Sequence, residues 1–487
     1  MGDRLPEISG AENQREPDSM LDTTTPSGSS DMLPTSGDAT NHDANKVRRN
    51  LFATVSDGAF ANPAFALTGE VVRTVFLNLI LASSASAQAL FKTILGSLAA
   101  AELLLWSIPT FIIVWAMSGA TRKAGVVFFL GWLSRLKVFS FLIGAALVPV
   151  ASPETVLIVI FSIFLVGQLS EGANVPVWTV YTGSLFPPGM LGRVYGNRSL
   201  FGGVLSIVFL FIAYFIMTHP ALRVALPFPS NFVIIFAMAS LLSLLSQVSL
   251  IYTVEADYPK NDVKRAPIHV FIKDWWQYGK SRRDIRIVVF SFVLERLSVF
   301  GAMSFITVKL LDICDFTSNP GGVPLVFGWV IPGPGEIGLV VTVAFFVGLA
   351  MFGRLTGWVI DHYGFRTWRL INSVVRIISF ALILTANSPL IIIIAVILQG
   401  WCLGGGWTGF FTISQSLAPL ENRMKCQLWL ALAVMTASPA GIAAGMIGDR
   451  YGLNLNFSIA IGIACVNLVF SAICFPAIRP KRHTTTV

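Results

Sequence analysis

Charged side chains are scarce in this chain of 487 residues. Asp, Glu, Lys and Arg together make up 12% of it, whereas about 25% is typical of a soluble domain. A chain of this length can bury a large apolar core, but a soluble protein also needs a polar surface to cover that core. The shortage of charge therefore excludes an ordinary water-soluble enzyme.

Cysteine and histidine are also few, with five of each. The cysteines form no Cys-x-x-Cys pair, and the histidines form no His-Glu-x-x-His motif. A disulfide framework and a zinc site are therefore not expected, and we predict neither a metal nor a cofactor. The sequence also has no recognisable set of acid, base and nucleophile at a membrane face, which argues against a membrane enzyme.

Long apolar runs are abundant, since 54% of the residues are hydrophobic. Many runs reach about twenty residues, the length that crosses a ~30 Å hydrocarbon layer as a helix. Because these runs are continuous, they favour helices over barrel strands, in which polar and apolar residues alternate. Twelve such segments can be marked: 51–80, 88–117, 125–150, 154–184, 197–218, 230–253, 287–311, 337–360, 367–386, 389–416, 427–448 and 455–477.

The twelve segments fall into two sets of six, separated by a polar break. We predict an all-α membrane protein whose twelve transmembrane helices form two six-helix bundles. The parts are a disordered cytoplasmic tail at 1–45, an N-terminal bundle at 46–253, a cytoplasmic linker at 254–286, a C-terminal bundle at 287–478 and a basic tail at 479–487. The first tail has too few apolar residues to offset the entropy lost on folding.

The linker is predicted to contain an amphipathic helix. Its apolar residues recur at i, i+3, i+4, i+7 and i+8, which places them on one helical face: Ile268, Phe271, Ile272, Trp275 and Trp276. Such a helix is typical of a membrane surface. A docking site for a regulatory protein is the alternative interpretation.

The net charge of +8 is unevenly distributed. Residues 1–45 hold nine acids and two bases, which leaves +15 on the rest of the chain. Most of these bases fall at alternate connections between segments, on one side of the membrane. By the positive-inside rule, both termini and the linker are cytoplasmic, and we expect the plasma or inner membrane as the location. This topology accounts for the basic excess, so nucleic-acid binding is not expected.

A weak internal repeat relates the two halves. Residues 151–153 (Ala-Ser-Pro) open the fourth segment and 387–389 (Asn-Ser-Pro) open the tenth. Arg135 and Arg376 lie at similar depths in the third and ninth segments. Two related halves that face each other are the architecture by which a transporter exposes one site to each side of the membrane in turn.

The sharpest motif is GWVIDHYGFR at 357–366, in a short turn between two segments. Gly357 allows close helix approach and Gly364 permits a tight turn, while Asp361 can face a helix N-terminus, where a carboxylate is favoured. The turn resembles the signature loop of the major facilitator superfamily, G-x-x-x-D-x-x-G-x-R/K. The resemblance implies that Gly357, Asp361, Gly364 and Arg366 form a cytoplasmic latch and do not bind substrate.

The resemblance is incomplete in the first half of the chain. The family also carries this loop between its second and third helices, where the present sequence is SGATRKAG at 118–125. That loop keeps Arg122 and Lys123 but has no aspartate, which argues against a symmetrical pair of latches. Together with the twelve segments, the remaining match implies the fold of the superfamily over roughly residues 46–478.

Polar residues inside the apolar segments are candidates for transport chemistry, because a charge in hydrocarbon costs about 2.5–3.5 kcal/mol. Helices 1, 4, 7 and 10 line the central cavity in the family, so the resemblance implies that their polar residues bind substrate or a proton. The candidates are Glu70, Arg73, Glu171, Asn174, Glu295, Arg296, Gln399 and Trp401. Salt bridges that hold neighbouring helices together are the alternative for the charged residues, and simple packing is the alternative for Trp401.

These features indicate a secondary active transporter that moves a small solute by alternating access, as a monomer in the lipid bilayer. An ATPase module is not recognisable, so uphill transport would need an ion gradient. The proton is the candidate coupling ion, acting through Glu171 or Glu295. The alternative is a carrier-like sensor or scaffold that no longer transports.

Overall fold

The computed structural model of the chain describes residues 36–69, 72, 76–77, 79–80, 91–118, 120, 122–187, 190–255, 266–300, 302–314, 316, 322–324, 330–331, 333–419 and 422–478. By its internal contacts the chain divides into two units, Met1–Ala44 and Asn45–Val487. Only the beginning of the first helix represents the first unit. The helical bundle belongs to the second.

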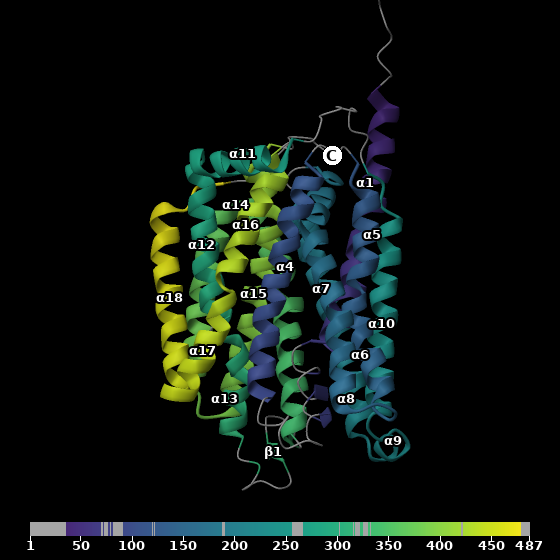
Figure 1. The fold of residues 1–487 in the computed structure, drawn as a ribbon. Helices are drawn as coiled ribbons and strands as arrows, with labels where there is room; N and C mark the ends of the chain where they lie inside the picture. Colours follow the sequence, from purple (N-terminus) through teal and green to yellow (C-terminus); the bar gives the residue numbers. More distant parts are fainter. Residues whose placement is uncertain are drawn as a thin grey trace, which may run out of the picture. The chain divides into compact units, whose positions relative to one another are not determined.

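The described part of the chain is almost entirely helical (Figure 1). The first half contains α1 (Ser36–Leu67), α4 (Phe91–Ala116), α5 (Ala124–Ser134), α6 (Leu136–Leu147), α7 (Pro153–Ser184), α8 (Leu191–Thr218), α9 (Pro220–Ala225) and α10 (Ser230–Ile251). The second half contains α11 (Ile268–Ser281), α12 (Arg283–Phe300), η1 (Met303–Phe305), α13 (Ile306–Ile313), α14 (Pro334–Thr385), α15 (Pro389–Leu417), α16 (Arg423–Thr436), α17 (Ser438–Tyr451) and α18 (Leu453–Cys474). Two short strands, β1 (Val323–Pro324) and β2 (Val330–Ile331), pair antiparallel, with Val323 opposite Ile331. The predicted all-α fold class is confirmed.

Eight helices of the described residues are long and apolar enough to cross a membrane. One of them, Glu336–Thr385, contains two segments that the sequence predicts separately, 337–360 and 367–386. The chain turns between these segments at Gly364, whose φ of 85° lies in the left-handed region that glycine adopts without steric cost. The eight helices therefore account for nine of the twelve predicted segments.

The other three predicted segments are 51–80, 88–117 and 287–311. Helices α1 and α4 lie in the first two of these segments, and the third is divided into α12 and α13 by the short turn η1. Helix α1 begins at Ser36, so its first residues fall within the predicted N-terminal tail. Residues 1–35 of that tail and the basic tail at 479–487 lie outside the described residues.

Serine and proline mark where several of the long helices begin. Ser152 precedes α7, and its hydroxyl accepts a hydrogen bond of 3.3 Å from the amide of Thr155. Pro153, Pro334 and Pro389 lie in the first turns of α7, α14 and α15. A proline is tolerated there because the amide that it lacks has no partner within the helix. These signals set the entry points of the helices that carry the candidate site.

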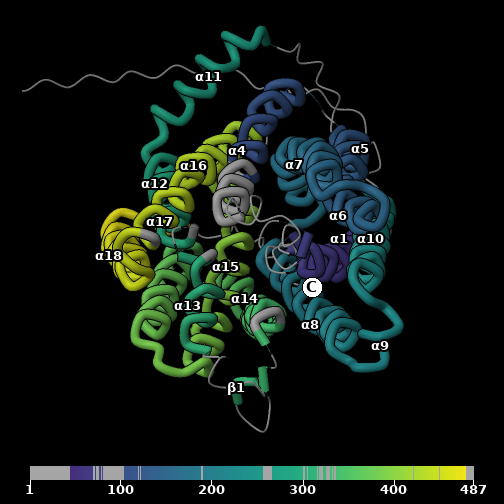
Figure 2. The backbone as a smooth tube through the Cα atoms, turned by 60° about the horizontal axis from the view of Figure 1, so that its bottom comes forward, coloured from purple at the N-terminus to yellow at the C-terminus, as the bar shows by residue number. Residues whose placement is uncertain are grey.

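Helix α14 packs against both α8 and α15, and thereby joins helices from the two halves of the chain (Figure 2). Helices α7 and α15 form a second contact between the halves, and α4 and α16 form a third. On α18, the side chains of Val466, Val469 and Ile473 are each more than half exposed. An apolar outer surface of this kind suits contact with lipid, so the polar groups buried between helices are the unusual feature of the fold.

Helix α11 lies across the top of the bundle in Figure 1, within the predicted linker. Of the five apolar residues predicted to share one face, Phe271 and Trp275 are buried, whereas Ile268, Ile272 and Trp276 are exposed. Trp275 contacts Phe111 of α4 and Trp429 of α16. The exposed Trp276 also lies against Trp429, at 5.4 Å between ring centres, so aromatic residues of both halves hold the helix. The end of the bundle that carries α11 is called the linker end below.

Candidate functional site

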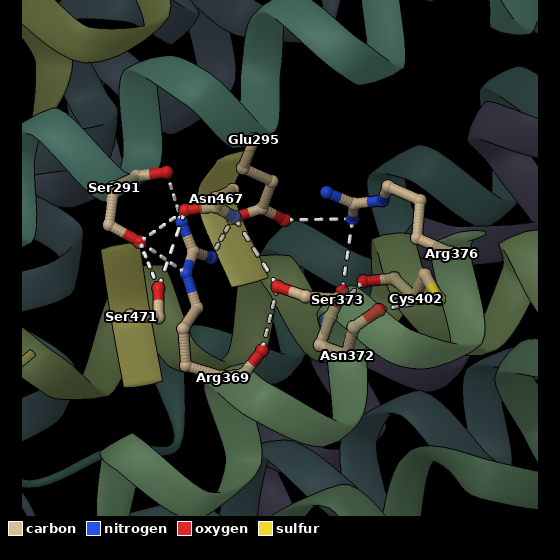
Figure 3. A network of polar contacts seen from close by, with 9 residues as sticks. All are labelled: Ser291, Glu295, Arg369, Asn372, Ser373, Arg376, Cys402, Asn467 and Ser471. Carbon is tan, nitrogen blue, oxygen red and sulfur yellow. Dashed lines mark hydrogen bonds and ion pairs between the residues drawn. The ribbon is translucent and has the colours of Figure 1, made fainter. Parts of the chain in front are cut away.

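A buried carboxylate on α12 joins two arginines of α14 (Figure 3). The side chain of Glu295 is 1% exposed. One of its oxygens, Oε1, accepts a 2.9 Å hydrogen bond from Nη2 of Arg376, and the other, Oε2, accepts a hydrogen bond from Nη1 of Arg369. Arg369 also donates to the hydroxyl and the carbonyl oxygen of Ser291, at 2.8 and 2.6 Å. The charged groups therefore tie α12 to the second part of α14.

Polar side chains from neighbouring helices extend this network. Asn372 accepts a hydrogen bond from Arg376 and donates one of 2.9 Å to the carbonyl oxygen of Cys402 on α15. Ser291 donates to Asn467 of α18, and Asn467 donates in turn to Ser373 of α14. Four helices thus meet around one buried carboxylate. A polar group in such a place must be hydrogen-bonded, because water cannot satisfy it.

The network lies deep in the bundle. Glu295 is twelve residues beyond the start of α12 at Arg283, which corresponds to about 18 Å along the helix at a rise of about 1.5 Å per residue. A hydrocarbon layer is ~30 Å thick, so a residue about 18 Å along a helix that starts at the surface would lie near its middle. Substrate sites of alternating-access transporters lie at this depth.

Arg296, the neighbour of Glu295, differs from the other two arginines. Its side chain is fully buried, and none of its three guanidinium nitrogens has a hydrogen-bond partner among the described residues. The guanidinium carbon lies 4.2 Å from the ring centre of Trp407 on α15. A cation over an indole face is attracted to it, although this gives only about 0.5–2 kcal/mol. Arg296 is therefore an unpaired charge in a buried place.

Gln399 and Trp401 of α15 lie in different environments. Gln399 is fully buried, and within the described part of the chain neither its amide oxygen nor its amide nitrogen has a partner. Because Gln399 and Cys402 are three residues apart, they share a helix face. The carbonyl oxygen of Cys402 accepts a hydrogen bond from Asn372 of the network. Trp401, in contrast, donates a 3.0 Å hydrogen bond to Thr356 and stacks on another ring of α14. Packing thus accounts for Trp401 but leaves the Gln399 amide unexplained.

Two candidates lie on α7, in the other half of the chain. Glu171 forms an ion pair with Lys137 of α6, and both side chains are partly exposed. Oδ1 of Asn174 is buried and lacks a hydrogen-bond partner in the described structure. Asn174 stands one helical turn before Trp178, whose ring contacts Phe411 of α15 at 5.3 Å. The remaining two candidates, Glu70 and Arg73, lie outside the described residues.

A second buried network, which the candidate set did not include, surrounds Asp57 of α1. Arg198 of α8 forms an ion pair with Asp57 at 2.8 Å, and Arg135 lies 3.9 Å from the same carboxylate. The Ser246 hydroxyl of α10 accepts a 2.8 Å hydrogen bond from Arg135 and donates one of 2.6 Å to Asp57. Each half therefore contains an ion pair between a carboxylate on its first helix and an arginine near the middle of its third.

The predicted latch motif connects α14 to α8 at the linker end. Asp361 accepts hydrogen bonds from the backbone amides of Gly192 and Arg193, at 3.2 and 2.9 Å. These amides belong to the first turn of α8, where backbone donors have no partner within the helix and the dipole favours a negative charge. Arg366, beyond the turn at Gly364, donates to the carbonyl oxygen of Ala472 on α18. The carboxylate thus links two helices from different halves of the chain.

Glycine makes this close contact of α8 and α14 possible. A Cβ atom added at Gly357 would lie 2.0 Å from the carbonyl oxygen of Gly192, and one added at Gly192 would lie 2.4 Å from Oδ1 of Asp361. Further along the same pair of helices, a Cβ at Gly196 would lie 3.0 Å from the carbonyl oxygen of Gly353. Any side chain at Gly357 would therefore separate the two helices. The motif is built for a contact between backbones.

A further contact closes the linker end between α7 and α15. Gln415 donates a 3.0 Å hydrogen bond to the carbonyl oxygen of Thr179. A Cβ atom added at Gly183 would lie 2.3 Å from the Gln415 side chain. The two halves are thus held together at this end by backbone-to-side-chain contacts, which can be made and broken without separating charges. Among the described residues, no group of three or more His, Cys, Asp or Glu side chains could hold a metal ion.

Comparisons with known proteins agree with this arrangement. A model of the Major Facilitator Superfamily matches residues 327–486. The structure is similar to that of the proton:xylose symporter XylE, at a TM-score of 0.62 and 13% identity over 89% of this chain and 97% of that one. The family match covers about one third of the chain, in its C-terminal part, and the solved structure shows that the fold extends over the rest. No curated protein sequence matches it.

Other solved transporter structures are also similar to this chain. The human organic anion transporter MFSD10 matches with a TM-score of 0.58 and 12% identity, over 87% of this chain and 99% of that one. The fucose:proton symporter FucP of E. coli matches with a TM-score of 0.56 and 11% identity, over 88% and 98%. At such identities the structures share the fold with this chain.

The superfamily match contains the latch motif and α15 but not α12. Glu295 and Arg296 therefore stand outside the matched residues, and their roles rest on the contacts described above. Of the predicted site residues, the structure places Glu295 in the network and Arg296 beside it, whereas Gln399 has no hydrogen bond to the network among the described residues. It places Glu171 and Asn174 on α7 instead. Arg369, which the sequence assigns to a cytoplasmic loop, is a central member of the network; its spacing of seven residues from Arg376 is the signal that could have revealed it.

Proposed function

We propose that the protein is a secondary active transporter that moves a small solute across the membrane by alternating access. The observation that carries this proposal is the capping of α8 by Asp361. The contact joins the two halves at one end of the bundle, and it consists of hydrogen bonds and glycine contacts that separate without a large cost. A transporter must open a contact of this kind to release a solute at the linker end.

Buried polar groups without partners support a solute site farther from the linker end. Arg296 and Gln399 have unsatisfied polar atoms on α12 and α15, as does Asn174 on α7, within the described residues. An unpaired buried polar group destabilises a protein by about 1–3 kcal/mol. Such groups are explained if a bound solute satisfies them during transport.

The test is solute flux in proteoliposomes that contain the purified protein. A set of labelled solutes is followed with and without an inward proton gradient. Uptake above that of empty vesicles supports the proposal. If the folded protein moves none of them but its tail or linker binds a protein partner, the alternative of a non-transporting sensor or scaffold replaces it.

Proton coupling is proposed to act through Glu171. This carboxylate has a partly exposed side chain and an ion pair with Lys137, whereas Glu295 is enclosed by two arginines. Gain and loss of a proton at Glu171 would break and remake the ion pair between α6 and α7. We expect Glu171→Gln to abolish the stimulation of uptake by a proton gradient. Glu154→Gln, at an exposed position of the same helix, is the matched control; stimulation that survives in Glu171→Gln excludes this residue.

We propose the orientation predicted from the distribution of Lys and Arg, in which both termini and the linker are cytoplasmic. The proposed location is the plasma or inner membrane. The monomer is the proposed working form. Protease treatment of sealed vesicles, followed by detection of tags at each terminus, distinguishes the two orientations. A cytoplasmic location predicts protection of both tags in right-side-out vesicles.

A further inference from the structure

The charges around Glu295 do not balance. Within the described residues, one carboxylate, Glu295, interacts with the three guanidinium groups of Arg296, Arg369 and Arg376. All four side chains are buried. A buried ion needs a partner, because removal from water costs several kcal/mol for each ion even after the protein relaxes. The cluster therefore has a positive charge that its own described side chains do not neutralise.

The three cations and one anion leave a net charge of +2, and Arg296 is the cation that makes no hydrogen bond to the carboxylate. Both oxygens of Glu295 accept hydrogen bonds from α14, one from Arg369 and one from Arg376. The Asp57 network provides an internal comparison, since its two arginines, Arg135 and Arg198, both lie within ion-pair distance of the carboxylate. Arg296 has no hydrogen bond to any described residue. Its three nitrogens are therefore available to a partner other than the described residues.

The surroundings of Arg296 would strengthen an interaction with an anion. The guanidinium lies over Trp407, which stacks on Phe411 at 5.7 Å and meets Trp106 of α4 edge-on at 6.2 Å. Aromatic rings lower the local dielectric constant, and an ion pair is stronger there than in water. The planar fork of a guanidinium also matches the two oxygens of a carboxylate. Because Trp106 and Trp407 come from different halves, an anion bound here would contact the place where the halves meet.

We propose that Arg296 binds the anionic group of the transported solute, so that the protein carries small organic anions. This rests on the proposed function, and it adds the substrate class. Arg296 supplies the charge, and Trp407 packs against the face of its guanidinium. A neutral solute of the same shape leaves the charge unpaired and binds more weakly.

The first test measures binding without transport. Purified wild-type protein in detergent is heated in the presence of benzoate or succinate, and of their neutral amides benzamide and succinamide, with sodium chloride supplying constant ionic strength. A ligand that binds only the folded state raises the unfolding temperature. We expect at least one carboxylate to raise it and its amide to raise it less. An equal effect of each acid and its amide, or no effect of either carboxylate, overturns the proposal.

The second test assigns the effect to Arg296. We expect Arg296→Gln to weaken carboxylate binding about 10- to 100-fold, because hydrogen bonds to charged groups are lost. Arg223→Gln removes an exposed arginine on α9 and is expected to leave binding unchanged. If Arg296→Gln does not fold, Arg296→Lys serves instead, since it keeps the charge but loses the planar fork. Wild-type affinity in the folded Arg296 variant contradicts the proposal.

Measurements of solute flux distinguish failure of the anion-site inference from failure of the proposed transporter function. Carboxylate binding that depends on Arg296, without any flux, supports the anion site and contradicts the transporter. Flux of a neutral solute that is unchanged in Arg296→Gln supports the transporter and contradicts the anion site. Uptake of a carboxylate that is lost in Arg296→Gln and retained in Arg223→Gln supports both.

Discussion

Arg135 and Arg376 hold equivalent places in the two halves of the chain, and each lies beside a buried carboxylate on the first helix of its half. Arg376 binds Glu295 at 2.9 Å, and Arg135 lies 3.9 Å from Asp57. A residue of the last long helix completes each network, since Ser246 of α10 bonds to Asp57, and Asn467 of α18 bonds to the Ser291 that holds Arg369. The weak sequence repeat is thus accompanied by a repeat of buried polar contacts.

The two networks differ in how much of their charge is compensated. Asp57 faces two arginines that both contact it, whereas Glu295 has two contacting arginines and a third, Arg296, beside it. Paired charges can hold helices in position. Arg296, in contrast, has no hydrogen-bond partner among the described residues through which it could do so. The symmetry between the halves therefore helps to separate the structural arginines from the one proposed to bind substrate.

We expect Glu295→Gln to destabilise the protein by about 3–5 kcal/mol, the usual effect of removing one partner of a buried ion pair. The substitution leaves the guanidinium groups of Arg369 and Arg376 buried without their anion. Unfolding in detergent, followed by tryptophan fluorescence, measures the loss. Glu154→Gln, which changes an exposed glutamate, should alter the free energy of unfolding by less than about 0.5 kcal/mol. Equal stability of the two variants would mean that the Glu295 ion pairs do not stabilise the fold.

Arg296→Met should have the opposite effect in the protein without bound anion. The substitution replaces an unpaired buried charge with an apolar side chain that fills much of the same space beside Trp407. We expect an unfolding temperature equal to or above that of the wild type, because the cost of burying the charge disappears. Arg376→Met, at a paired arginine of the same network, should lower the unfolding temperature. A similar drop in both variants would show that Arg296 has a structural role.

The sequence predicts the fold more completely than it predicts the site. Apolar runs and turn signals locate the helices, because a helix in lipid must satisfy its own backbone and therefore leaves a long continuous pattern. The pattern of charges also identifies Glu295 and Arg296 as unusual. It cannot tell which arginine is paired, since that depends on contacts between α12 and α14, seventy or more residues apart.

The errors of assignment have the same physical origin. Arg369 lies close to the turn at Gly364, at the edge of the predicted segment 367–386, so its position does not single it out; the helix that begins at this turn carries it inward against Ser291. For Trp401 the structure favours the packing alternative, since its indole nitrogen donates a hydrogen bond to Thr356. Long polar side chains reach partners several ångströms from their own backbone, so sequence position alone does not fix their environment.

Asp361→Asn should weaken closure at the linker end. The asparagine keeps one acceptor oxygen but loses the negative charge that faces the first turn of α8, and the loss of such a cap costs about 0.5–2 kcal/mol. A thiol introduced by Ser199→Cys, at the contact of α8 with Gly353, reports on the opening. We expect faster reaction with a maleimide in Asp361→Asn than in Asp312→Asn, which changes an exposed aspartate of α13. Identical rates would mean that Asp361 does not hold the closed state.

Gly357→Ala tests whether closure depends on direct contact between backbones. The added methyl group would lie 2.0 Å from the carbonyl oxygen of Gly192, and a backbone atom cannot rotate away as a side chain can. The helices α8 and α14 must therefore separate, which also stretches the hydrogen bonds from Gly192 and Arg193 to Asp361. Gly462→Ala is the matched control, because a Cβ atom there meets nothing within 4 Å; its gain in helix propensity is at most about 1 kcal/mol. We expect Gly357→Ala to lose uptake and Gly462→Ala to keep it. When each is combined with Ser199→Cys, we expect the thiol to react faster with the maleimide in Gly357→Ala. If Gly357→Ala is as active as Gly462→Ala, the closed contact of these two helices is not a step of transport.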